Sequence, residues 1–181
     1  MIRWGLGYAA AFAVVMAFGF GAIGFDARAE ESDAPPNPSP ERVPSFQLRD
    51  QFNNEHRVEF PRDRPTVLAL ADRKGSDQLE GWLEPLGDEF GETVHFDGVA
   101  DVRGVPSLLR WGVRQIFRRG TKEPVMLDWE DAVCTSLAFE KEVANVLVLD
   151  QKGHIVLRVH GEANAEELER VRAAIVELRA K

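Results

Sequence analysis

Apolar and polar residues alternate with two different periods along residues 45–181, and each period predicts one kind of element. Residues 44–50 and 57–60 alternate in twos around a turn-rich stretch, which predicts a β-hairpin. Residues 66–71 are continuously apolar, as in a central strand that is buried on both faces. Further strands are predicted at residues 93–99, 124–128, 143–149 and 155–159, and a short hairpin turn joins the last two.

Segments whose apolar residues have helical spacing lie between or after these strands. One stripe follows a cap at Ser76 or Asp77, another starts near Pro106 and ends at Gly120, and the last follows a cap at Asn164. Residues 130–141 predict a helix or a helical turn. This order of elements predicts an α/β fold, in which a central mixed sheet carries helices on both faces.

The first 44 residues have a different pattern. Arg3 precedes an apolar run of about 22 residues at positions 4–25, which ends in the small-residue pattern Ala27-Arg28-Ala29. We expect residues 1–29 to be a signal peptide that is cleaved after Ala29, so that the protein is exported to the periplasm. The alternative is an uncleaved anchor, in which residues 4–25 hold the protein in the inner membrane. Residues 30–44 are a proline-rich linker, and residues 45–181 are one domain.

Composition and cysteine content narrow the classes of function. The net charge of −8 argues against nucleic acid as a partner, because phosphate binding needs a basic surface. Cys134 is the only cysteine, so the chain has no C-x-x-C motif and forms no disulfide within itself. We predict no metal site and no cofactor, since His154 and His160 would lie about 20 Å apart along one strand.

Two segments carry a resemblance to a known family. Residues 43–51 read Val-Pro-Ser-Phe-Gln-Leu-Arg-Asp-Gln, and residues 146–156 read Val-Leu-Val-Leu-Asp-Gln-Lys-Gly-His-Ile-Val. With their order and spacing, they resemble the redoxin branch of the thioredoxin superfamily, which includes the peroxiredoxins, across residues 43–181. Within that branch the chain is similar to the YtfJ-type periplasmic proteins. The resemblance implies a thioredoxin-like fold with an N-terminal β-hairpin extension.

The chain departs from that family at both halves of the redox site. In the enzymes, the nucleophilic cysteine follows the first central strand, but residues 71–78 contain none. The resemblance also implies that Ala144 replaces the family's cis-proline. The turn at the degenerate site is still a candidate binding turn, in which backbone N–H groups could hold an anion; the alternative is an ordinary capped turn. Its candidate residues are Asp72, Arg73, Lys74, Ser76 and Asp77.

Two further features have competing interpretations. Cys134 lies beside Val133 and Leu137, so it is either a small buried hydrophobic residue or a reactive or dimer-forming thiol. Arg110, Arg114 and Arg118 form a basic stripe on one helix. This stripe either meets an acidic partner or lipid headgroups, or is a solvated helix face.

The leading hypothesis is a non-catalytic binding or interaction module of the cell envelope, whose partner is an envelope protein or peptide. The alternative is a divergent redoxin-type oxidoreductase that uses Cys134, or a partner's cysteine, for thiol or peroxide chemistry. A third hypothesis is a membrane-tethered accessory factor, which requires that residues 4–25 are retained. A membrane is therefore a partner only in that case.

Overall fold

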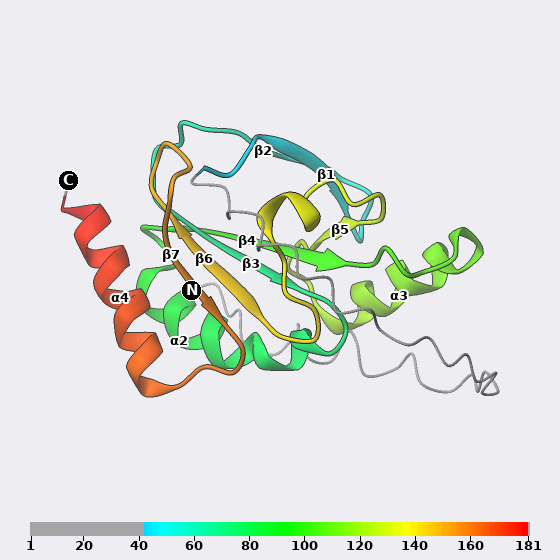
Figure 1. Ribbon diagram of the computed structural model, residues 1–181. Coiled ribbons are helices and arrows are strands. Elements are labelled where there is room, and N and C mark those ends of the chain that lie inside the picture. Colours follow the sequence, from blue (N-terminus) through cyan, green and yellow to red (C-terminus); the bar gives the residue numbers. More distant parts are fainter. Residues whose placement is uncertain (1–41, 181) are drawn as a thin grey trace, which may run out of the picture.

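Seven strands form one mixed sheet in this computed structural model, which describes residues 42–180 (Figure 1). The strand order is β2-β1-β5-β4-β3-β6-β7. The strands are β1 (Phe46–Asp50), β2 (Glu55–Val58), β3 (Thr66–Ala71), β4 (His95–Asp101), β5 (Met126–Asp128), β6 (Asn145–Leu149) and β7 (Ile155–His160). The predicted signal peptide, and the predicted linker as far as residue 41, lie outside the described residues.

Three neighbouring strands at the centre of the sheet are parallel. β4 pairs with β3 on one side and with β5 on the other, and both connections pass through a helix. The helices are α2 (Glu80–Phe90) and α3 (Arg110–Gly120). The remaining neighbours are antiparallel, namely β1 against β5 and β6 against β3, with the hairpins β1–β2 and β6–β7 at the two ends. The carboxyl ends of β3, β4 and β5 therefore meet at one edge.

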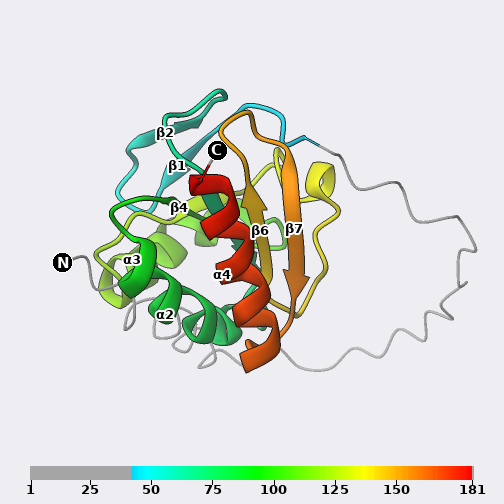
Figure 2. The ribbon, with the colours of Figure 1, turned by 90° about the vertical axis from the view of Figure 1, so that its left-hand side faces the viewer.

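The continuous apolar run of β3 is buried because both faces of the sheet are covered. Val67, Ala69 and Ala71 point into a core shared with α2, α3 and the C-terminal helix α4 (Ala165–Arg179). Leu68 and Leu70 point into a second core on the opposite face. That second core is closed by the β1–β2 hairpin and by the 3₁₀ turn η4 (Thr135–Leu137). Figure 2 shows α4 lying across β6 and β7.

Most element boundaries agree with the sequence-based predictions, and the differences have local causes. Asn164 caps α4 as predicted, because its side-chain oxygen accepts a hydrogen bond from Glu167 N at 3.0 Å. Neither Ser76 nor Asp77 caps α2; a 3₁₀ turn η2 (Gly75–Gln78) comes first, and Ser76 Oγ donates to Arg73 O instead. Residues 130–141 contain only the turn η4 rather than a full helix. Val43, expected near the end of the linker, is buried and donates its N–H to Gly153 O.

The predicted fold class is confirmed: the sheet is mixed, helical segments cover both of its faces, and an antiparallel hairpin precedes the central strands. Among residues 42–180, no helix combines the length and the apolar character that crossing a bilayer requires.

Candidate functional site

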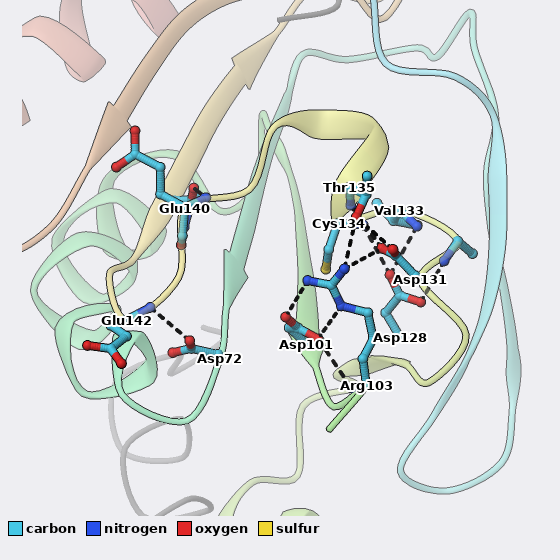
Figure 3. A network of polar contacts seen from close by, with 12 residues as sticks. Asp72, Asp101, Arg103, Asp128, Asp131, Val133, Cys134, Thr135, Glu140 and Glu142 are labelled. Atoms are coloured by element: carbon cyan, nitrogen blue, oxygen red, sulfur yellow. Dashed lines mark hydrogen bonds and ion pairs between the residues drawn. The ribbon is translucent and has the colours of Figure 1, made fainter. Parts of the chain in front are cut away.

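Three aspartates form a row at the carboxyl edge of the parallel strands. Asp101 and Asp128 are the last residues of β4 and β5, and they lie opposite each other in the register of the two strands. Asp72 directly follows β3 in the same register. Each carboxylate follows a buried strand, which is the sequence signal by which the row could have been found. Only Asp72 was among the predicted site residues. Figure 3 shows that the three side chains contact different residues of the loops.

Asp72 joins the candidate binding turn to the segment that precedes β6. Its Oδ1 accepts hydrogen bonds from the backbone N–H groups of Lys74 and Gly75, at 3.0 and 2.9 Å. Its Oδ2 accepts one from Glu142 N at 2.8 Å, and Glu142 has a left-handed backbone with φ of +68°. The N–H groups that could have held an anion are therefore already bound to a carboxylate of the same chain, as in a capped turn.

Further contacts hold the same two segments together. Lys74 Nζ forms an ion pair with the Glu142 carboxylate. Gln78 Oε1 accepts from Ala144 N at 3.0 Å. A Cβ atom built on Gly75 would lie 2.3 Å from the carbonyl oxygen of Val143, so only glycine fits here. These contacts join the turn after β3 directly to the segment before β6.

The remaining predicted residues of the turn divide by exposure. Ser76 is buried and its hydroxyl is bound to Arg73 O, so it offers nothing to a ligand. The side chains of Arg73 and Asp77 are exposed. Ala144 is buried directly before β6, and the peptide bond before it is not cis; the cis bond within residues 42–180 is Phe60–Pro61.

The second aspartate, Asp101, is neutralised by an arginine. Arg103 donates to both carboxylate oxygens of Asp101 and pairs with Asp131 at 2.7 Å. Burial raises the pKa of Asp101, but the hydrogen bonds from Arg103 outweigh it and hold that pKa below its usual value. The same hydrogen bonds raise the pKa of Arg103. Both groups stay charged near neutral pH, so the pair does not suit proton transfer.

Cys134 is buried against this network (Figure 3). The third aspartate, Asp128, accepts hydrogen bonds from the N–H groups of Ala132, Val133 and Cys134, at 2.8 to 3.1 Å. Burial raises the pKa of the Cys134 thiol, and the negative charges of Asp128 and Asp101 raise it further. A thiol in this environment stays protonated, whereas a nucleophilic cysteine needs a lowered pKa.

The predicted basic stripe packs against aromatic rings. The guanidinium groups of Arg110 and Arg114 lie over the Trp129 ring, 5.2 and 5.8 Å from its centroid. Arg118 lies over Phe52, and its Nε donates to Gln51 O at 2.8 Å. The stripe therefore attaches α3 to the body of the domain, and it is not a purely solvated helix face.

No group of three or more His, Cys, Asp or Glu side chains within residues 42–180 is placed to hold a metal ion. The structure also does not bring Cys134, the basic stripe and the turn into one site. Cys134 belongs to the core on the η4 face, and the turn is bound to residues 142–144.

Comparisons with known proteins place the fold. No protein-family model matches this chain, and no curated protein matches it. A proposed thiol:disulfide interchange protein DsbE from Chlorobium tepidum is similar in structure, with a TM-score of 0.57 and 12% identity over 78% of this chain and 97% of that one. A proposed protein disulfide isomerase from Bacteroides thetaiotaomicron has a TM-score of 0.59 and 14% identity over 78% and 89%. Peroxidoxin BcpB from Mycobacterium tuberculosis has a TM-score of 0.53 and 17% identity over 78% and 96%. The chain therefore has the thioredoxin-like fold, and it carries that fold with a single cysteine.

Proposed function

We propose that this protein is an exported, non-catalytic binding module of the cell envelope, comparable to the YtfJ-type periplasmic proteins. One observation carries the non-catalytic part. The turn after β3 holds no cysteine, and its Asp72 carboxylate is bound to Lys74 N, Gly75 N and Glu142 N of the same chain. Export rests on the sequence of residues 1–29, and the partner we expect is an envelope protein or peptide.

The alternative, thiol or peroxide chemistry at Cys134, is not favoured by its surroundings. The side chain is fully buried, and its thiol has a raised pKa. Reaction with a disulfide or a peroxide requires an accessible thiolate. An oxidoreductase of this kind would have to open the η4 segment before each turnover.

The catalytic question is tested by reduction of insulin with dithiothreitol as the electron source. We expect no turnover above the dithiothreitol background, because the chain has no pair of cysteines to cycle. A thioredoxin with an intact C-x-x-C motif serves as the positive control. Activity that disappears in the Cys134→Ser variant would overturn the non-catalytic proposal and support the oxidoreductase.

The binding question is tested by capture of partners from the envelope fraction with the tagged protein. The matched variant carries Arg73→Ala and Asp77→Ala, since both side chains are exposed and the bonds of Asp72 are left intact. Partners that are lost in this variant assign binding to the turn. Partners that are retained exclude the turn as the binding surface.

A further inference from the structure

The most exposed apolar side chains of the described domain lie together around the start of α3. Leu108 is 90% exposed, Leu109 57% and Trp111 73%. Leu108 and Leu109 belong to the 3₁₀ turn η3 (Ser107–Leu109), and Trp111 lies in the first turn of α3. We call these three side chains, together with the outer face of α3, the η3–α3 surface. Exposure of two leucines and a tryptophan within four residues is costly in water unless the surface is covered.

Positive charge is concentrated in the same segment. Residues 102–122 contain six basic residues and no Asp or Glu, in a chain whose net charge is −8. The basic residues are Arg103, Arg110, Arg114, Arg118, Arg119 and Lys122. Several of these, Arg118 included, bind within the domain, but Arg119 and Lys122 remain exposed at the C-terminal end of α3.

The orientation of α3 brings the apolar and basic groups to one side. Phe117 is the buried residue of the helix and Val113 packs against the same core, so the opposite side faces outward. Trp111 and Arg119 are both exposed and eight residues apart, two steps of four, which places them on the same face of a helix. The outer side therefore has an apolar end and a basic end.

A lipid surface fits this arrangement better than a protein partner. α3 and the segment before it lie at the periphery of the domain (Figure 1), and Leu108, Leu109 and Trp111 are exposed there. A stable protein interface buries about 800 Å² on each partner, more than three projecting side chains supply. Tryptophan and leucine beside arginines are typical of helices that lie in the headgroup region of anionic membranes.

If residues 4–25 are retained as an anchor, the alternative to cleavage after Ala29, the chain before Arg42 favours the same occupant. The apolar run ends at residue 25, and 16 residues separate it from Arg42. Fully extended, they reach roughly 55 Å, which lets the domain touch a membrane that holds residues 4–25. A single weak contact then becomes effective, because the tether raises the local concentration of lipid.

We propose that the η3–α3 surface rests on an anionic lipid surface. Leu108, Leu109 and Trp111 enter the boundary between headgroups and acyl chains, and Arg119 and Lys122 face the lipid phosphates. This inference goes beyond the proposed function and holds whether or not Cys134 has any chemistry. Insulin reduction tests only the proposed function, so the two can fail separately.

The test uses the full chain with a fluorescent probe at one position. Leu108→Cys, in a Cys134→Ala background, is labelled with a nitrobenzoxadiazole dye, whose emission rises on leaving water. The labelled protein is bound to vesicles of phosphatidylcholine with or without phosphatidylglycerol. We expect a several-fold rise in emission with phosphatidylglycerol, weakened by added salt. The same dye at Val176→Cys, an exposed position on α4, is the matched control and should not change.

A double variant, Arg119→Glu with Lys122→Glu, changes two exposed side chains and should abolish the rise. The proposal is overturned if the emission is the same on both kinds of vesicle, or if the double variant responds like the parent. A rise with soluble envelope proteins, and none with vesicles, would also overturn it and assign the surface to a protein partner.

Discussion

Asp128 determines the path of the chain after β5. Its side chain is buried and accepts three backbone hydrogen bonds from residues 132–134, so it organises a segment that has little regular structure. The sequence predicted burial of Cys134 from its apolar neighbours. It did not predict the role of Asp128, because a carboxylate that binds distant N–H groups leaves no periodic pattern in the sequence.

The environment of Cys134 makes its reactivity predictable. Native protein should react slowly with Ellman's reagent and rapidly in denaturant, because the thiol is buried and its pKa is raised. Cys134→Ala should lower the free energy of unfolding by about 1 kcal/mol through lost packing. Fast labelling of the native protein, or a sulfenic acid trapped after brief peroxide treatment, would contradict this account.

At the scale of elements, the strands were predictable and the contacts between loops were not. The continuous apolar run of β3 and the stripe of α4 bury side chains in a fixed period, so sequence alone locates them. The turn after β3 was predicted as a candidate binding turn. Its partner, the segment 142–144, is some 70 residues away, and no local pattern relates the two.

A pair of glycine substitutions tests how tightly these loops are joined. Gly75→Ala places a Cβ against the backbone of Val143 and should cost about 2 kcal/mol or more of unfolding free energy. Gly112→Ala meets no atom within 4 Å in the first turn of α3 and should raise stability by about 0.4 to 1 kcal/mol. Urea unfolding of both variants measures the difference. Equal effects would mean that the turn yields without strain.

At the scale of the whole molecule, the fold followed from the order of elements and from the resemblance of residues 43–51 and 146–156. The extent of the surface that the domain covers did not follow from either. Exposure of Leu108 and Trp111 depends on where the body of the domain ends, which the pattern of apolar residues does not specify.

Acid should destabilise the molecule through several carboxylates at once. Asp50 is buried and Asp101 and Asp150 are partly buried, which raises their pKa values, but the hydrogen bonds that each carboxylate accepts, including those from His56, Arg103 and His154, together lower them more. Because the folded pKa lies below the unfolded one, the stabilisation is complete above about pH 4 and is lost as the pH falls through the folded pKa. Urea midpoints measured from pH 7 to pH 3 should therefore fall below pH 4.

Asp101→Asn should show a smaller loss over the same range, since it lacks one of these groups. The exposed Asp77 provides the control, and Asp77→Asn should follow the parent protein. Parallel curves for Asp101→Asn and the parent would show that the Arg103 pair does not contribute to acid sensitivity.

The hydrogen bond from Glu142 N to Asp72 also bears on whether thiol chemistry could be introduced into the turn. A single Asp72→Cys change would place a thiol in the turn, but it would remove the acceptor of three backbone N–H groups. The new thiol would have no second cysteine nearby, since Cys134 is buried elsewhere. A single substitution towards thiol chemistry thus lowers stability and yields no activity, so the turn's own hydrogen bonds keep a cysteine out of this position.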